Sequence, residues 1–190
     1  MGKNSNTKRN NQVRIIGGTH RGRKIAFADA EGLRPTPDMV REKLFNWLGQ
    51  NLTGQKVLDL FSGSGALGFE AASRHAQRVV MVENNRATLQ TLRNGVRDLG
   101  LAQIETVGSD GLLYLKNHTE QFDVVFLDPP FAWWQWAELF QYLQARLADG
   151  AAVYIEAGAL PETPAWLQPY RSGAVGKSRF ELFVYTQVAE

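Results

Sequence analysis

KVLDLFSGSGALGFE, residues 56–70, is the stretch that decides the fold. Its apolar start, Lys56–Phe61, predicts a buried strand, the glycines predict a tight turn, and Ala66–Arg74 predicts a helix. The same strand–helix order then recurs along the chain. Further strands are predicted at Arg78–Glu83, Ile104–Val107, Phe122–Leu127 and Ala152–Glu156, and further helices at Arg86–Leu99, Leu112–Lys116 and Trp136–Leu147.

This alternation predicts the fold class. Strands that alternate with helices form an α/β protein, and near-continuous apolar strands are typical of a parallel sheet that helices cover on both faces. We therefore expect a doubly wound, mostly parallel sheet of seven strands. Its last part, Ser172–Val175 and Phe180–Thr186, predicts an antiparallel C-terminal hairpin at one edge of the sheet.

The chain before the sheet has a different character. Val13–Ile16 and Lys24–Phe27 predict a small N-terminal β-hairpin, and the asparagine-rich residues 1–12 are expected to be disordered. A helix is predicted next, with Thr36 as its N-cap and Pro37 at its first position.

Charge is distributed unevenly along the 190 residues. Seven of the 21 basic residues and none of the 19 acidic residues lie within residues 1–28, so the rest of the chain carries a net charge of −5. A basic segment joined to a mildly acidic body is typical of proteins that bind a polyanion, although a solvated tail has the same composition. We expect residues 1–35 to form a basic arm and residues 36–190 to form one α/β domain.

Composition excludes several classes of protein. The chain has no cysteine, which excludes disulfide scaffolds, iron–sulfur centres and thiol catalysis. His75 and His118 have no second ligand at metal spacing, so no metal site is predicted. No apolar run approaches the ~20 residues of a membrane span, and the polar, basic start does not resemble a secretory signal. We expect a soluble, cytoplasmic monomer with no membrane partner.

A glycine-rich loop follows the first strand of the predicted sheet. Gly63, Gly65 and Gly68 satisfy the G-x-G-x-x-G pattern, and Glu83 lies 20 positions after Gly63, at the end of the next strand. Glycines let a backbone approach a ligand closely, and an acid at this place can accept both hydroxyl groups of a ribose. The pattern fits either a dinucleotide or S-adenosylmethionine. A tight turn without a ligand would also explain the glycines.

Two further acids bear on the choice of cofactor. Asp59 precedes the loop, where a carboxylate would repel a pyrophosphate but favour the ammonium or sulfonium group of S-adenosylmethionine. Asp110 follows the next strand along the chain, where it could accept from an adenine amine, cap the following helix, or do both. We therefore expect S-adenosylmethionine as the cofactor.

Asp128-Pro129-Pro130-Phe131 directly follows the predicted strand Phe122–Leu127. The two prolines fix φ and donate no N–H, so they predict a rigid corner with free carbonyl oxygens. Asp128 and the Pro129 carbonyl can accept both protons of an exocyclic amine while Phe131 stacks on the ring, and Asp128 can take the released proton. A rigid turn with no ligand is the alternative.

These residues carry a family resemblance. Asp128–Phe131, Asp59–Gly68 and Glu83 resemble the class I S-adenosylmethionine-dependent methyltransferases that modify amino groups of bases. Arg34–Leu48, which reads RPTPDMVREKLFNWL, and Val57–Glu70 resemble the RsmD family of bacterial proteins, and the match covers nearly the whole chain. The resemblance implies a Rossmann-like methyltransferase fold and methylation of N2 of one guanine in 16S ribosomal RNA, with the RNA or a small-subunit assembly intermediate as partner.

The resemblance also implies roles for single residues. Gly63 and Gly65 would bind the methionine end of the cofactor, where the Asp59 carboxylate is expected to favour its positive charge. Glu83 would bind the ribose and Asp110 would meet the adenine.

The target guanine would meet Asp128 and Phe131. The segment that begins at Arg34 would close over the cofactor side, which makes Thr36 and Arg41 candidate contacts there. A helix cap and a surface charge explain these two residues equally well.

The basic hairpin is expected at the mouth of the site, where phosphate contacts would position RNA without reading its sequence. The candidate RNA contacts are Arg21, Arg23, Lys24, Arg34 and Pro130. Trp133 and Trp134 are candidates for a wall of the base pocket, and Trp136 is expected in the core.

Three other functions remain open from the sequence. A nicotinamide-dependent oxidoreductase would share the glycine pattern and Glu83. A non-catalytic RNA-binding factor could keep a degenerate methyltransferase fold, and a DNA-directed amino methylase would share the Asp-Pro-Pro-Phe corner.

Overall fold

The computed structural model describes residues 11–27 and 35–187. Its strands are β1 (Gln12–Arg14), β2 (Lys24–Ala26), β3 (Lys56–Asp59), β4 (Arg78–Glu83), β5 (Ile104–Gly108), β6 (Phe122–Leu127), β7 (Leu147–Ala157), β8 (Leu167–Val175) and β9 (Ser178–Tyr185). Its helices are α1 (Asp38–Trp47), α2 (Ala66–Ser73), α3 (Arg86–Leu99), α4 (Gly111–Asn117) and α5 (Trp136–Leu143), with a 3₁₀ turn at Gln144–Arg146.

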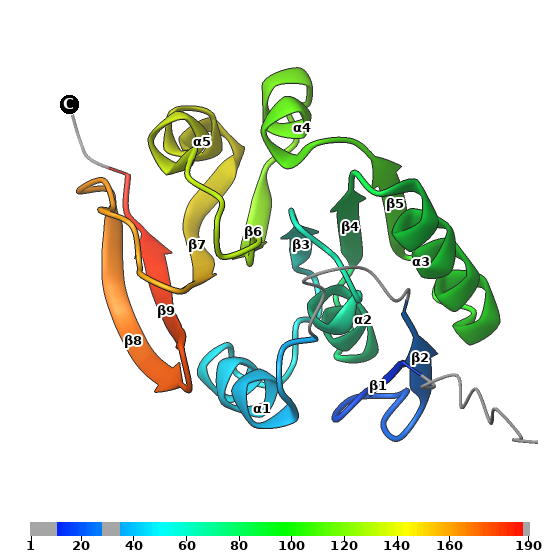
Figure 1. The fold of residues 1–190 in the computed structure, drawn as a ribbon. Helices are drawn as coiled ribbons and strands as arrows, with labels where there is room; N and C mark the ends of the chain where they lie inside the picture. The colour runs from blue at the N-terminus through cyan, green and yellow to red at the C-terminus, as the bar shows by residue number, and fades with distance from the viewer. Residues whose placement is uncertain (1–10, 28–34, 188–190) are drawn as a thin grey trace, which may run out of the picture.

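The central sheet has seven strands in the order β5-β4-β3-β6-β7-β9-β8. The first five of these are parallel, and β9 runs antiparallel to both β7 and β8. The predicted doubly wound, mostly parallel sheet with a C-terminal hairpin at one edge is confirmed (Figure 1). The order departs from the 3-2-1-4-5-6 order of the dinucleotide-binding fold, because the last strand is inserted antiparallel beside the fifth.

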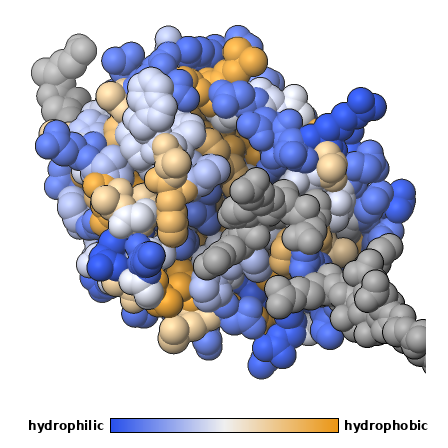
Figure 2. All heavy atoms as spheres, in the orientation of Figure 1, coloured by the Kyte–Doolittle hydropathy of each residue, from blue (hydrophilic) through white to orange (hydrophobic). Residues whose placement is uncertain are grey.

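Helices cover both faces of this sheet. In Figure 1, α4 and α5 lie on one side of the strands, whereas α1 and α2 lie on the other. Two apolar cores follow from this arrangement: one includes Phe45 and Phe69 of α1 and α2, and the other includes Leu115 and Leu139 of α4 and α5. Hydrophilic residues form most of the outer surface in the same view, and hydrophobic ones show nearer its middle (Figure 2).

The N-terminal hairpin is present and packs against the first core. β1 and β2 form a separate two-stranded antiparallel sheet. Val13, Ile15 and Ile25 are buried in the same core as α2. Of the segment expected to be disordered, residues 1–10 lie outside the described residues, but Gln12 belongs to β1.

The prediction that Thr36 caps a helix is wrong. α1 begins at Asp38, Pro37 holds the N-cap position with an extended ψ of 147°, and no side chain caps the helix. The hydroxyl of Thr36 instead donates to Oδ2 of Asp128 over 3.2 Å. The Thr36 hydroxyl, which the local sequence pattern assigned to the helix N-terminus, thus makes a tertiary contact with Asp128 instead.

The predicted helix Trp136–Leu147 is too long. α5 ends at Leu143, a 3₁₀ turn follows, and Leu147 already pairs with Phe122 as the first residue of β7. The apolar spacing continues through Leu147 because that residue is buried, 2% exposed, by the strand rather than by the helix. Similarly, β3 ends at Asp59 instead of Phe61, so the loop before α2 is longer than predicted.

Candidate functional site

The site lies where the order of the strands reverses. From β3 the chain builds β4 and β5 on one side, then crosses to β6 on the other. The carboxyl ends of β3 and β6 therefore flank the topological switch point, where open α/β sheets bind ligands. Asp59 ends β3 and Asp128 follows β6, so the structure brings these two predicted residues to the same edge.

The glycine loop joins β3 to α2 through two residues in left-handed conformation, Gly63 (φ 47°) and Gly65 (φ 79°). The turn is closed by a hydrogen bond from the Gly65 N–H to the Ser62 carbonyl, 2.7 Å long. A Cβ on Gly65 would stand 2.7 Å from carbon atoms of Leu92 and Phe69, which leaves no room for a side chain. The loop can therefore present backbone N–H groups at the N-terminus of α2 only with glycine at this position.

Glu83 joins the loop to β4. One carboxylate oxygen accepts from the Gly63 N–H at 3.0 Å, and the other accepts from the Asn85 N–H at 2.7 Å. The acid and the glycine that the sequence separates by 20 positions are thus in direct contact. Glu83 therefore fixes the loop in this structure. It also stands at the end of the second parallel strand, where an acid can accept hydrogen bonds from the hydroxyl groups of a ribose.

Asp59 is turned inward beneath the loop. It is 2% exposed, and its Oδ2 accepts from the Gly68 N–H in the first turn of α2 at 3.0 Å. Burial raises the pKa of Asp59 to about 7; the Gly68 hydrogen bond lowers it, and the charge of Glu83 raises it. A Cβ on Gly68 would stand 2.8 Å from the Met81 side chain and 3.0 Å from this carboxylate, so the third glycine of the motif makes room for both Met81 and Asp59.

Asp110 stands at the carboxyl end of β5, as predicted. Its side chain accepts from the Leu113 N–H at 3.0 Å and caps α4. The structural explanation of Asp110 is therefore confirmed. Its predicted contact with adenine stays a prediction.

Asp128 begins the corner after β6. It is half-buried and accepts from Thr36, as described above. Burial raises the pKa of Asp128 well above its ordinary value, with further increases from the charges of Glu156 and Asp59, while the Thr36 hydrogen bond lowers it. A carboxylate with a raised pKa is a better proton acceptor near neutral pH.

The prolines differ in their surroundings. Pro129 is buried and Pro130 is exposed. The Pro130 carbonyl accepts from the Trp133 N–H at 2.8 Å, so it closes a turn and is not one of the free carbonyl oxygens expected from the sequence. The proposed acceptor is the Pro129 carbonyl, one residue earlier.

Aromatic rings surround the corner. Phe131 is 60% exposed, with its ring against Gly158 after β7. Trp133 packs edge-on against Phe61 of the glycine loop, with ring centroids 5.3 Å apart, and against Trp136, at 5.0 Å. Trp134 is 80% exposed. Of the two tryptophans predicted to wall the pocket, Trp133 thus joins the two loops of the switch point and Trp134 presents its ring to solvent.

Sequence reasoning missed Glu156. It lies at the end of β7, is 5% exposed, and accepts from the hydroxyl groups of Tyr154 and Ser178 at 2.8 and 2.6 Å. Leu127, the last residue of β6, pairs with Ile155 of β7, so the residues that follow these two in the chain, Asp128 and Glu156, are neighbours at the sheet edge. The signal was available, because Glu156 is the last residue of a predicted buried strand, as Glu83 is.

Of the two explanations left open for Arg41, the surface charge is wrong. The side chain is 1% exposed and pairs with Glu70 of α2 at 3.2 Å. Arg41 also donates to Asp38 and to the Thr36 carbonyl. The sequence contains the acid partner 29 positions later, but no local pattern links the two.

The basic hairpin lies one helix length from the glycine loop. Its turn is bound at the far ends of α2 and α3, where Ser73 accepts from the Thr19 and His20 N–H groups and Leu99 contacts the His20 ring. Arg21 and Arg23 belong to this turn and Lys24 begins β2. These residues are exposed, but they stand away from the mouth of the site, whereas Arg34 lies outside the described residues.

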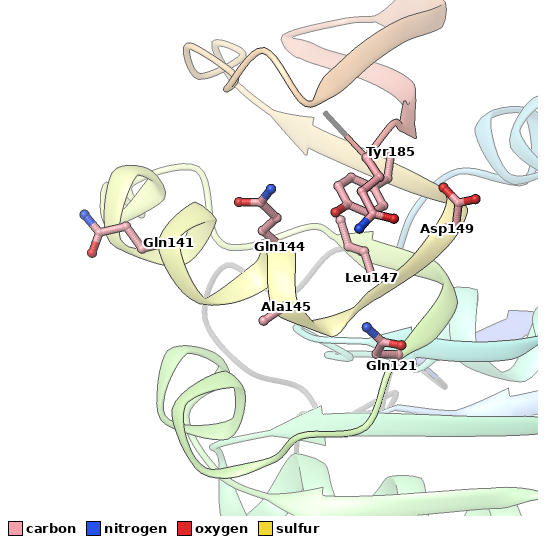
Figure 3. Close-up of a pocket in the computed structure, with 8 residues that line it drawn as sticks. Gln121, Gln141, Gln144, Ala145, Leu147, Asp149 and Tyr185 are labelled. Atoms are coloured by element: carbon pink, nitrogen blue, oxygen red, sulfur yellow. The ribbon is translucent and has the colours of Figure 1, made fainter. Parts of the chain in front are cut away.

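Two surface hollows lie at the opposite edge of the sheet. One, of about 460 Å³, is lined by Gln121, Gln144 and Tyr185 among others (Figure 3). The other, of about 250 Å³, includes Lys56 and Arg78. Both stand at the amino ends of the parallel strands, whereas Asp59, Glu83 and Asp128 stand at the carboxyl ends. We therefore locate the candidate site by its chemistry at the carboxyl edge.

Two other kinds of feature are missing from the described part of the chain. Within residues 11–27 and 35–187, no group of three or more histidine, aspartate or glutamate side chains is arranged to hold a metal ion. None of the helices in these two ranges is long and apolar enough to cross a membrane.

Known structures share this architecture. A putative methyltransferase, yhhF, from Escherichia coli superposes with a TM-score of 0.84 at 38% identity, covering 92% of this chain and 98% of that one. An RNA methyltransferase from Salinibacter ruber, solved in complex with S-adenosyl-L-homocysteine, has a TM-score of 0.66 at 19% identity, covering 83% and 97%. The second likeness shows the fold alone.

Sequence comparison gives the family. The model "Conserved hypothetical protein 95" matches residues 13–184. Ribosomal RNA small subunit methyltransferase D of Escherichia coli K12 is 38% identical over 186 residues, or 95% of this chain and 94% of that protein. Its namesake from Haemophilus influenzae is 46% identical over 124 residues, or 63% and 64%. The chain therefore belongs to the family of ribosomal RNA small subunit methyltransferase D, the RsmD family.

Proposed function

We propose that this protein transfers a methyl group from S-adenosylmethionine to the exocyclic N2 amine of a guanine in 16S ribosomal RNA of the small subunit. One observation carries the proposal: the half-buried Asp128 and the exposed Phe131 follow β6 at the switch point, at the same edge of the sheet as the Gly63–Glu83 contact. Family membership supports ribosomal RNA methylation, since the named relatives are small-subunit ribosomal RNA methyltransferases. The choice of guanine N2 is the finer part of the proposal.

The residues at the carboxyl edge fit the proposed cofactor. Gly63 and Gly65 have no side chain to obstruct a ligand and would bind its methionine end. Glu83 would bind its ribose and Asp110 its adenine. The charge of Asp59 raises the pKa of Asp128, so this edge of the sheet is acidic and would stabilise a cation nearby. When bound, S-adenosylmethionine supplies an electrophilic methyl group on a sulfonium.

Catalysis by the chain itself is chiefly positioning. Phe131 would stack on the purine, while Asp128 and the Pro129 carbonyl accept the two N–H groups of the amine. This arrangement favours a pyramidal nitrogen with its lone pair free, which a conjugated amine otherwise lacks. Asp128 then takes the proton that the amine releases, directly or through water.

RNA capture would use the basic hairpin and the corner. We propose that Arg21, Arg23 and Lys24 bind phosphates, with Arg34 and Pro130 nearer the target base. Because the hairpin turn is bound at the far end of α2, these contacts would lie on RNA beyond the methylated nucleotide. The proposal includes a monomeric enzyme in the cytoplasm that acts on ribosomal RNA or an assembly intermediate.

Mapping the product tests this function. Purified protein is incubated with S-adenosylmethionine and either naked 16S ribosomal RNA or small subunits from cells that lack the protein, and the product is mapped by nuclease digestion and mass spectrometry. We expect one new N2-methylguanine, which is absent with Asp128→Asn. Methylation of an adenine, of another guanine atom or of DNA alone would contradict the proposal.

Calorimetry separates the oxidoreductase from the methyltransferase. We expect S-adenosylmethionine to bind at one site per chain and NAD to show no saturable binding. The reverse result would overturn the proposed cofactor.

A further inference from the structure

Thr36 connects the entry of α1 to the corner after β6. It is 6% exposed, and its hydroxyl donates to Oδ2 of Asp128 at 3.2 Å, across 92 positions of sequence. A buried hydroxyl needs a hydrogen-bond partner. The Thr36 hydroxyl does not find one in the backbone at the start of α1, because no side chain caps that helix. The contact leaves the second oxygen of Asp128 for the amine of a substrate.

Arg41 fixes the backbone of Thr36. Its Nε donates to the Thr36 carbonyl at 3.1 Å, and its two terminal nitrogens donate to Glu70 and Asp38. The guanidinium is planar and is bound on all three sides, so it holds these groups in one geometry. Thr36 is therefore held from its carbonyl while its hydroxyl holds Asp128.

Glu70 fixes Arg41 in turn. It is fully buried on α2, and besides Arg41 it accepts from Arg74 Nε at 2.8 Å and from the Ile16 N–H at 2.9 Å. A buried carboxylate bound by two guanidinium groups and a backbone N–H has little freedom to move. The support for Thr36 thus reaches the centre of α2 and the end of the hairpin.

We propose that Thr36 is a positioning residue, whose hydroxyl orients the Asp128 carboxylate toward the amine, and that Arg41 and Glu70 keep Thr36 in place for this task. The inference rests on the proposed function and adds a residue to it. It also differs from the cofactor contact expected of Thr36 from the sequence, because the hydroxyl is committed to Asp128 rather than to a ligand.

The charges that face Asp128 agree with this role. Glu156 on β7 and Asp59 on β3 are both carboxylates, and each raises the pKa of Asp128. The Tyr154 hydroxyl next to them is directed to Glu156. The Thr36 donation stabilises the charged form of Asp128 against these neighbours, so its loss should raise the pKa of Asp128.

Two substitutions at Thr36 separate orientation from packing. Thr36→Val keeps the shape and removes the donor, whereas Thr36→Ser keeps the donor and removes a methyl group. We expect Thr36→Val to lower kcat at neutral pH roughly tenfold, since a hydrogen bond to a charged group is lost. We expect the acid limb of its kcat–pH profile to move to higher pH, with the Kd for S-adenosylmethionine unchanged within about twofold. Thr36→Ser should recover most of the activity.

A control shows what the same change does elsewhere. Thr91→Val on α3 also removes a hydroxyl, one that donates to the Ala87 carbonyl at 3.1 Å away from Asp128. It should alter neither kcat nor the pH profile. Thermal unfolding of all three variants reports whether each is folded.

A measurement without RNA tests the link itself. The carboxyl carbon of Asp128, labelled with ¹³C and assigned by its loss in Asp128→Asn, is titrated by NMR in the unaltered protein and in Thr36→Val. A higher pKa in Thr36→Val supports the proposal, and an equal pKa overturns it. Failure of Thr36→Ser to recover activity, or a loss confined to cofactor affinity, also overturns it. If the unaltered protein methylates no RNA, the proposed function fails instead, and the NMR result still decides the role of Thr36.

Discussion

Asp59 and Asp128 end neighbouring strands of one sheet, yet their surroundings differ. Asp59 is almost fully buried and accepts from a backbone N–H of α2. Asp128 is half-buried, accepts from a side-chain hydroxyl, and is followed by an exposed phenylalanine. The same residue type at the same edge thus has two environments, one enclosed by the fold and one open to a substrate.

The difference teaches how this site divides its work. A carboxylate bound to the backbone of a helix start holds that helix and its loop, and it influences a ligand through its charge. A half-buried carboxylate that is held through one oxygen by a side-chain hydroxyl can bind a substrate with the other oxygen and exchange a proton. We therefore propose that Asp59 holds the loop on the cofactor side and that Asp128 takes part in the chemical step.

Asp128→Asn gives the largest expected effect. The amide cannot take a proton, so kcat should fall roughly 10²–10⁴-fold while the Kd for S-adenosylmethionine changes little. Single-turnover methylation and calorimetry measure the two quantities. Turnover at the level of the unaltered protein would refute the division between the two acids.

Asp59→Asn tests the enclosed acid through stability. The folded pKa of about 7 lies above the ordinary value of 3.8, so folding disfavours the charged form. Any stability tied to the neutral acid is present at low pH and is lost as pH rises through 7. The introduced amide would stay neutral and still accept from the Gly68 N–H. Relative to the unaltered protein, the free energy of unfolding of the variant should therefore increase between about pH 4 and pH 7, by up to about 4 kcal/mol. Denaturant unfolding at pH 5 and pH 8 measures this difference, and equal curves at both pH values would contradict it.

Neutralising Arg21, Arg23 and Lys24 extends the comparison to a region far from both acids. RNA affinity should fall, and each lost phosphate contact should flatten the log–log salt dependence of binding by roughly 0.7–0.9. Cofactor affinity should not change. Neutralising Arg171, Lys177 and Arg179 on the C-terminal hairpin is the matched control. An unchanged slope in the first variant removes the N-terminal hairpin from the RNA site.

Trp134→Ala gives the smallest effect, on the open side of the comparison. The exposed ring, three residues after Phe131 in the chain, offers a stacking surface, so its loss should raise the Kd for RNA roughly fivefold, or about 1 kcal/mol. Tyr170→Ala removes another exposed ring, on β8, and should leave RNA binding unaltered. Equal effects of the two substitutions would exclude a specific role for Trp134.

The fold was largely predictable because its signals are local. The apolar runs and the glycines near residues 56–70 predict strands and turns directly, and the alternation predicts the sheet. A predicted helix end was wrong where a buried residue fits the apolar spacing of a helix and also begins a strand, as Leu147 does between α5 and β7.

The candidate site was predictable only in part. Acids at strand ends were found because the topology of a parallel sheet brings them to one edge, and Glu156 should have been included for the same reason. The partners of Thr36 and Arg41 could not be found, since they lie 92 and 29 positions away and depend on how α1 packs. The position of the hairpin turn likewise depends on its hydrogen bonds to Ser73.

The edge-on contact between Phe61 and Trp133 has a consequence for ligand binding. It joins the loop proposed for the cofactor to the loop proposed for the base, with ring centroids 5.3 Å apart. A ligand that reorders one loop must then alter the equilibrium of the other, and thermodynamic linkage makes the effect mutual. If S-adenosylmethionine changes the affinity of the protein for RNA by some factor, RNA should therefore change its affinity for S-adenosylmethionine by the same factor, in whichever order the two bind.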